Sequence, residues 1–178
     1  TTLFVSVAAG TTISYFEQTL GAQTPIVRAM PNTPAAISQG ITAIVANAAA
    51  GPSALDEAET LLSAVGDVVR LADEAQIDAV TGVSGSGPAY VFHMIETMAA
   101  AGISQGLPAD LSMQLAKATV AGAGALALQS DDTPSQLRVN VTSPNGTTQA
   151  ALEVLMDEEN GFPALLKRAV KAAADRSR

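Results

Sequence analysis

The sequence predicts an α/β segment followed by an all-α segment. Up to about residue 73, short runs of β-type residues alternate with helical patterns, which is the order of an α/β fold. Beyond Asp73 these runs stop, and apolar residues recur at helical spacing to the end of the chain. We therefore expect the architecture to change near residue 75, with one domain at 1–74 and a second at 75–178.

The first segment is expected to hold strands at 3–8, 25–30, 40–46 and 68–71, and helices at 12–20 and 53–65. The helix at 53–65 has the clearest pattern, with acidic residues in its early turns and Gly66 as its stop. The run Leu3 to Ala8 is interpreted as a buried strand and not as a signal peptide, so the chain is expected to begin within a domain.

The second segment is expected to contain helices at 88–101, 108–129, 134–141, 147–158 and 163–178, four of which begin near a proline. The helix at 108–129 carries small residues that let another helix approach closely, and its apolar surface extends far round the helix. Two interpretations stay open for it, a central core helix or a subunit interface.

Composition excludes several classes of function. A net charge of −8 with nine basic residues argues against nucleic acid as a partner. The chain has no Cys and one His, so we expect no bound metal, and a reducing cytoplasm fits. The longest apolar run, 118–128, is shorter than the roughly 20 residues of a spanning helix, so no membrane association is expected.

The loop 142–148, with the sequence TSPNGTT, leads directly into a helical pattern. The first amides of a helix lack internal partners, and the helix dipole favours an anion there. The hydroxyls of Ser143, Thr147 and Thr148 add donors. The alternative is a plain helix cap, in which a Ser or Thr closes its own helix.

A second cluster, SGSGPAY at 84–90, is interpreted as a Gly/Ser turn that enters a helix through proline. It could form a second backbone anion site, or its glycines could permit tight helix packing. It does not match a dinucleotide fingerprint, because Tyr90 occupies the third glycine position. The segment GAGALA at 122–127 matches the permissive dinucleotide fingerprint GxGxxA. It is not interpreted as one, because it lies inside a helical run and no strand precedes it.

A third cluster, RAMPNTP at 28–34, follows a predicted strand, as does Ala8-Ala9-Gly10. Ligands of open α/β sheets bind beyond the carboxyl ends of strands, so these loops are the expected cofactor-facing edges. The alternative is a structural turn in which Asn32 bonds its own backbone. His93 has only Glu96 as a carboxylate at helical spacing, which favours an ordinary His over a general acid.

These clusters in this order resemble the pyrroline-5-carboxylate reductase family. The matching segments are VAAGTTI at 7–13, VRAMPNTP at 27–34, DAVTGVSGSGPAY at 78–90 and LRVNVTSPNGTT at 137–148. The family usually has Gly where this chain has Asn145, and Asn tolerates left-handed geometry best among the other residues. We therefore expect the turn to be kept.

The resemblance implies the C-terminal part of a Rossmann NAD(P)-binding domain followed by a helical dimerisation domain. It implies NADPH or NADH as the cofactor, with the family's GxGxxG strand expected upstream of Thr1. It also implies a homodimer or a ring of dimers in the cytoplasm. The implied reaction is hydride transfer to 1-pyrroline-5-carboxylate, which gives L-proline.

Site residues are carried over by position. Ser143, Asn145, Gly146, Thr147 and Thr148 correspond to the substrate loop, and the Thr148 hydroxyl would orient the ring nitrogen as the catalytic group. The cofactor side corresponds to Ala8, Ala9, Gly10, Met30, Pro31, Asn32 and Asn140.

Two other interpretations stay open at this point. The first is a non-catalytic helical dimerisation module. The second is a reductase of the β-hydroxyacid dehydrogenase type, although Lys117 has no supporting motif for the catalytic Lys that such an enzyme needs.

Overall fold

The computed structural model describes residues 2–177, and the chain divides into two compact units. The first unit comprises Thr1–Pro88 and Arg168–Arg178, and the second comprises Ala89–Lys167. Each unit is described separately below.

The first unit is built on a four-stranded sheet in the order β1-β2-β3-β4. The strands are β1 (Phe4–Ser6), β2 (Ile26–Met30), β3 (Gly40–Ala46) and β4 (Gly66–Arg70). β2 runs parallel to β1 and antiparallel to β3, and β4 is parallel to β3. The predicted α/β architecture is confirmed, with one antiparallel pairing between two parallel ones.

The prediction of a buried first strand is wrong. β1 lies at one end of the sheet and pairs only with β2 among the described residues, and Phe4 is 42% exposed. The apolar run in the sequence identifies a strand, but burial on both sides depends on neighbours that an end strand lacks.

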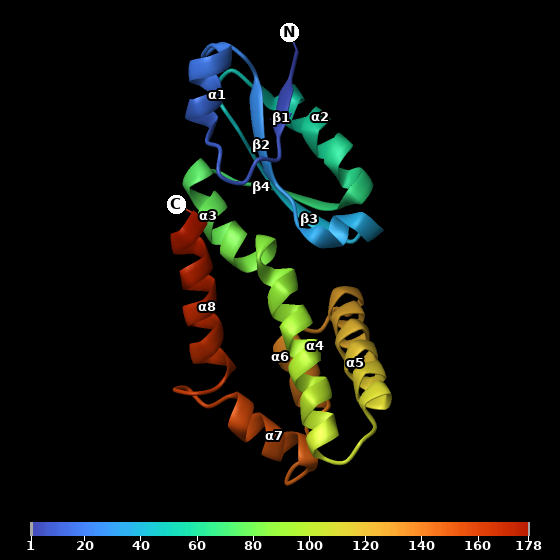
Figure 1. Cartoon of the computed structure of the whole chain (residues 1–178). Coiled ribbons are helices and arrows are strands. Elements are labelled where there is room, and N and C mark those ends of the chain that lie inside the picture. The colour runs from blue at the N-terminus through green and yellow to red at the C-terminus, as the bar shows by residue number, and fades with distance from the viewer. Residues whose placement is uncertain (1, 178) are drawn as a thin grey trace. The chain divides into compact units, whose positions relative to one another are not determined.

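Helices cover both faces of this sheet (Figure 1), with α1 (Ile13–Leu20) on one face and α2 (Pro52–Leu62) on the other. Alternate residues of β2 point to opposite faces, as the pleat of a strand requires. One face of β2 packs with Ile13 of α1, and the opposite face packs with Ala58 of α2. Both core clusters of the described residues therefore lie against this sheet.

The remaining short elements of the first unit are 3-10 helices and a π-helical turn. They are η1 (Thr33–Ile37), η2 (Ser63–Val65), η3 (Glu74–Gln76) and η4 (Thr81–Gly85). The predicted helix at 53–65 is thus α2 followed by η2, and it ends at Gly66 as expected. Gly66 has φ 142°, and a side chain there would collide with the backbone of Gly40 on β3.

For the segment 84–90, the predicted helix start beside Pro88 is confirmed, but the predicted Gly/Ser turn is wrong, because Ser84 and Gly85 lie in a π-helical turn. α3 (Ile77–Val80) leads into the π-helical η4, and α4 (Gly87–Ser104) follows. Hydroxyls inside this segment donate to helix carbonyls, Thr81 to Ile77 at 2.8 Å and Ser84 to Val80 at 3.2 Å. Because these side chains satisfy backbone groups of the helix, Ser residues that favour turns elsewhere are accommodated in a helix here.

The chain from Ile77 onward contains only helices among the described residues, which confirms the predicted change of architecture. These helices are α4, α5 (Ala109–Gln129), α6 (Pro134–Asn140), α7 (Thr147–Leu155) and α8 (Phe162–Ser177). Pro134 occupies the first turn of α6, and Pro108 is the N-cap of α5. Proline therefore marks these helix starts, as predicted.

α5 is apolar and largely exposed. Among the described residues it is the one helix that is long and apolar enough, by length and composition, to cross a membrane, and 11% of its most apolar window is buried. We expected no apolar segment as long as a membrane-spanning helix, and this expectation is wrong. The apolar run 118–128 is only part of a helix that begins at Ala109. Leu115 and Leu126, 47% and 55% exposed, belong to this apolar surface.

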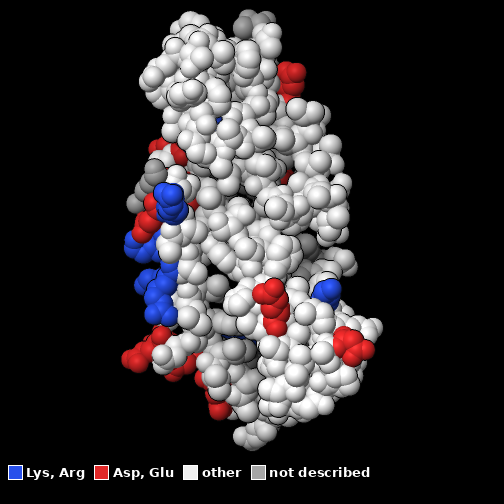
Figure 2. All heavy atoms as spheres, viewed as in Figure 1, with Lys and Arg blue, Asp and Glu red and all other residues white. Residues whose placement is uncertain are grey.

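Charged residues are sparse on the face shown in Figure 2, and most of the basic side chains visible there gather over α8. α8 carries Lys167, Arg168, Lys171 and Arg176, and Lys171 pairs with Asp175 one turn later. Most of the remaining face is uncharged.

Candidate functional site

The loop 142–148 connects α6 to α7 in the second unit. The Thr142 hydroxyl donates to the carbonyl of Arg138 at 2.6 Å and so anchors the loop to α6. The amide of Gly146 donates to the carbonyl of Ser143 at 3.0 Å and closes a turn. Asn145 has φ 57°, which confirms the expectation that an Asn keeps the left-handed turn.

The N-terminus of α7 is open. Its N-cap residue is Gly146, which has no side chain to cap the helix, and the carbonyl oxygen of the Gln149 side chain accepts from the Asn145 amide at 2.8 Å. Among the described residues, no hydrogen bond involves the hydroxyls of Ser143, Thr147 or Thr148. The alternative of a plain Ser or Thr cap is therefore wrong.

These features give the loop the chemistry of an anion site. The first amides of α7, on Thr147 and Thr148, have no hydrogen-bond partner inside the helix. The helix dipole places partial positive charge at the same end. Three free hydroxyls lie beside these amides, so a small carboxylate would meet donors from both the backbone and the side chains.

Asn140, assigned to the cofactor side, is the last residue of α6 and is already engaged within the second unit. Its Nδ2 donates to Asp132 at 3.1 Å, and its Oδ1 accepts from Gln136 at 2.8 Å. Each of these atoms can take one further hydrogen bond. The network holds the side-chain amide in one orientation.

The other residues assigned to the cofactor lie in the first unit, beyond the ends of β1 and β2. Because these two strands are parallel, their carboxyl ends share one edge of the sheet. Ala8, Ala9 and Gly10 are exposed there, and a side chain built on Gly10 would meet no atom within 4 Å. The small side chains leave the backbone at this edge accessible to solvent.

Met30 and Asn32 contribute mainly to structure at this edge. Met30 is 9% exposed, packs in the core beside Ile13, and its methyl group lies where a side chain on Gly85 would be. The side-chain oxygen of Asn32 accepts from the amide of Ile41 at 2.9 Å. Asn32 therefore forms a hydrogen bond with the backbone nine residues further along the chain. The neighbouring Pro31 is half-buried.

Two glycines near η4, Gly82 and Gly85, lie in close contact with other segments of the first unit. A side chain at Gly82 would meet the carbonyl oxygen of Val170 on α8 at 2.7 Å and the side chain of Ala174 at 3.4 Å. Gly82 precedes the cluster 84–90, and a side chain on Gly87 inside the cluster would meet no atom within 4 Å, so packing of two helices through the cluster's glycines is not supported. Gly85 packs against a strand residue, Met30, and not against a helix.

His93 is a surface residue. Its side chain is 75% exposed, and its Nδ1 lies 3.2 Å from Glu96 one turn along α4. The interpretation as an ordinary His is supported. Among residues 2–177, no group of three or more His, Asp or Glu side chains is placed to hold a metal ion.

Glu74 was missed by the sequence reasoning. Its carboxylate binds both the side chain of Arg28, at 2.6 Å, and the amide of Ile13, at 2.9 Å. Arg28 stands inside the apolar strand β2 and is 5% exposed. A charged residue in a buried strand requires an acceptor. An Arg inside the apolar run of β2 is therefore the feature of the sequence that indicates a carboxylate partner.

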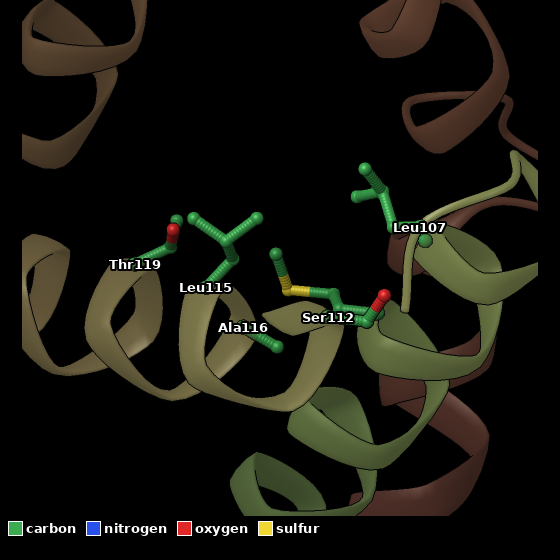
Figure 3. Close-up of a pocket in the computed structure, with 7 residues that line it drawn as sticks. Leu107, Ser112, Leu115, Ala116 and Thr119 are labelled. Atoms are coloured by element: carbon green, nitrogen blue, oxygen red, sulfur yellow. The ribbon is translucent and has the colours of Figure 1, made fainter. Parts of the chain in front are cut away.

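Two hollows among the described residues contain no predicted site residue. One, of about 160 Å³, lies in the second unit between α4 and α5, where Leu115 and Thr119 of α5 point toward it (Figure 3). The buried hydroxyl of Ser112 beside it has no hydrogen-bond partner. The other, of about 390 Å³, lies in the first unit against β3 and β4.

Fold and site together define a class of protein, in which a Rossmann-type α/β unit is followed by a helical unit whose loop 142–148 leaves the start of α7 without a side-chain cap. The family model described as pyrroline-5-carboxylate reductase dimerisation matches residues 74–178. The chain is 48% identical to a pyrroline-5-carboxylate reductase of Pseudomonas aeruginosa and 44% identical to one of Mycobacterium tuberculosis. These alignments cover 98% of the chain and 63% and 64% of the two relatives.

Solved structures agree with these matches. A pyrroline-5-carboxylate reductase from Coxiella burnetii superposes with a TM-score of 0.93 at 38% identity, covering 98% of this chain and 64% of that one. A pyrroline carboxylate reductase from Plasmodium falciparum with NADP bound superposes with a TM-score of 0.86 at 32% identity, covering 98% and 66%. The chain belongs to the pyrroline-5-carboxylate reductase family.

The sequence left two other interpretations open, a non-catalytic helical dimerisation module and a reductase of the β-hydroxyacid dehydrogenase type. The family matches favour neither of them. The chain spans 63% to 64% of the length of these curated relatives.

Proposed function

We propose that the protein catalyses the NAD(P)H-dependent reduction of 1-pyrroline-5-carboxylate to L-proline, the last step of proline synthesis. The main support is the 48% identity to a pyrroline-5-carboxylate reductase over 98% of the chain. The open N-terminus of α7 supports the same substrate, because its free amides and hydroxyls suit a carboxylate. The associated domains are a cofactor-binding part at 1–74 and a substrate-binding and dimerisation part at 75–178.

In this proposal, Ser143, Asn145, Gly146 and Thr147 hold the substrate carboxylate at the start of α7. The Thr148 hydroxyl, one position further into the helix, donates to the ring nitrogen and orients it. As the imine is reduced, basicity grows at that nitrogen, so a donor placed there favours the transition state over the ground state.

The cofactor side is proposed to comprise Ala8, Ala9, Gly10, Met30, Pro31, Asn32 and Asn140. A bound NADPH or NADH would supply the hydride. Ala8, Ala9 and Gly10 would approach it with their backbone, while Met30 and Asn32 would support the edge from the core and from β3.

The experiment replaces Thr148 with Ala and follows NADPH consumption with 1-pyrroline-5-carboxylate. We expect kcat to fall about 10- to 100-fold with little change in KM, because the hydroxyl acts mainly in the transition state. Thr97→Ala on the exposed surface of α4 is the control and should leave both constants unchanged. An unchanged kcat with a raised KM would reject the role of Thr148, and no turnover by the unsubstituted protein would reject the proposed reaction.

The protein is also proposed to act as a homodimer, or as a ring of such dimers, in the cytoplasm. The match to a dimerisation family supports a homo-oligomer. The exposed apolar surface of α5 supports it independently, since only 11% of the most apolar window of this helix is buried and the rest needs a partner to cover it.

A further inference from the structure

Arg28 is a buried cation in the middle of β2. Its side chain is 7% exposed and lies on the same face of the strand as Ile26 and Met30, which belong to the core. A guanidinium so far from water must be fully paired to be tolerated.

The two partners of Arg28 come from distant parts of the chain. Its Nη1 donates to the carboxylate of Glu74 on η3 at 2.6 Å, and its Nη2 donates to the carbonyl of Ala9 at 2.6 Å. The same Glu74 oxygen accepts the amide of Ile13, the first residue of α1, at 2.9 Å. One ion pair thereby joins β2 and η3 to the loop between β1 and α1 and to the start of α1.

This loop has few other constraints. A turn closes where the Thr11 amide donates to the Ala8 carbonyl at 3.2 Å, and the Ser6 hydroxyl accepts from the Ala8 amide at 3.2 Å. The amides of Ala9 and Gly10 make no hydrogen bond among the described residues, and both residues are exposed. The conformation of the loop therefore depends on the carbonyl and the amide that Arg28 and Glu74 hold.

Stability alone accounts poorly for this pair. The Arg28 guanidinium loses its water, while the Glu74 side chain is 29% exposed, and the cost of removing the cation from water offsets much of the attraction between the two charges. Apolar side chains at these two positions could not fix a backbone carbonyl and a helix amide. The planar guanidinium can reach two acceptors at once in a fixed geometry, which a Lys ammonium does not reproduce.

We propose that Arg28 is a positioning residue which, through Glu74 and the Ala9 carbonyl, holds the loop Ala8–Gly10 in the conformation that receives the nicotinamide end of the cofactor. This inference rests on the proposed function. In this proposal, Arg28 and Glu74 do not contact substrate or cofactor, and they act only through the backbone of the loop.

The test compares the full chain with its Arg28→Lys and Glu74→Gln variants, both of which keep a long polar side chain. Amide hydrogen exchange is measured without ligand, and NADPH and L-proline binding are measured by calorimetry. We expect exchange of the hydrogen-bonded amides of Thr11 and Ile13 to rise about 10-fold while β3 is unchanged, because only the loop loses its anchors. NADPH affinity should fall about 10-fold, and proline affinity should stay within about two-fold.

Arg70→Lys is the matched control. Arg70 lies on β4 in the same unit and pairs with Asp56 and Glu59 of α2, but this pair is exposed and does not touch the loop. The control should change neither loop exchange nor NADPH affinity. In turnover assays the Arg28 and Glu74 variants should show a raised KM for NADPH and an unchanged KM for the imine.

Two results would overturn the inference. One is unchanged exchange at Thr11 and Ile13 in both variants, which would show that the loop does not need the pair. The other is faster exchange throughout β2 and β3, which would make the pair a general structural element. Absence of NADPH binding by the unsubstituted chain would count against the proposed function, while the exchange comparison would still decide whether Arg28 and Glu74 order the loop.

Discussion

Asn47 joins three elements of the first unit through a single side chain. It follows β3 and is 8% exposed. Its Oδ1 accepts from the amides of Ile26 at 3.0 Å and Ala50 at 3.1 Å. Its Nδ2 donates to the Thr24 carbonyl at 2.9 Å and to Glu17 at 3.0 Å. This one amide therefore links the start of β2 and the approach to α2 with α1.

Replacement of Asn47 by Ala should lower the free energy of unfolding by about 3 kcal/mol, because it leaves the buried amide of Ile26 and the carbonyl of Thr24 without their partner. Urea denaturation followed by circular dichroism measures this change. Gln18→Ala, which removes an exposed hydrogen bond within α1, is the control and should cost less than about 0.5 kcal/mol. Equal losses in the two variants would contradict the structural role of Asn47.

At the scale of elements, the connection between α7 and α8 is closed by one carboxylate. Asp157 accepts from the amide of Asn160 at 2.7 Å and from that of Glu159 at 3.1 Å. These two backbone hydrogen bonds, chiefly that from Asn160, lower the pKa of Asp157 below its ordinary value. The Asn160 side chain adds a weaker contribution in the same direction.

This lowered pKa gives the turn a pH dependence of known sign. The stabilisation from the Asp157 carboxylate is complete above the ordinary carboxyl pKa of about 3.9 and is lost as the pH falls through the lower folded value. We expect Asp157→Asn to be less stable than the unsubstituted chain at neutral pH, with the difference disappearing in acid. Urea titrations at several pH values measure it.

Glu158→Gln in the same turn provides the comparison, because the Glu158 carboxylate accepts no hydrogen bond from the described residues. Its effect on stability should not follow this pH profile. A difference between Asp157→Asn and the unsubstituted chain that persists unchanged in acid would argue against the charge as the cause.

At the scale of the whole molecule, the second unit exposes more apolar surface than an isolated domain normally does. Leu111 and Leu115, one turn apart on α5, are 40% and 47% exposed, and Leu128 near its end is 86% exposed. A side chain placed on Gly122 or Gly124 of the same helix would meet no atom within 4 Å. A second copy packed on α5 would account for both observations.

Leu115→Glu should therefore convert the proposed dimer to a monomer, because a charge at the centre of an apolar interface must be desolvated without a partner. Sedimentation or light scattering gives the mass. Thr60→Glu on the exposed surface of α2 is the control and should leave the mass unchanged. A Leu115→Glu variant with the mass of the unsubstituted protein would contradict an interface on α5.

Sequence pattern alone predicted the order of the strands and helices and the change to helices after Asp73, while the left-handed turn at Asn145 was expected from the family resemblance. These features depend on local periodicity and backbone preference, which neighbouring residues determine. For the candidate site, the sequence indicated the loop 142–148 and the edge loops. It could not show that Gly146, and not a Ser or Thr, would cap α7 and leave three hydroxyls free.

Only the tertiary structure decided the contacts between residues far apart in the chain. The pairing of Arg28 with Glu74 spans 46 residues, and the bond from Ile13 to Glu74 spans 61. The π-helical η4 depends likewise on Gly82 fitting against Val170 of α8. Periodicity specifies which face of an element is apolar, but not which distant side chain will meet it, because that depends on how the whole unit packs.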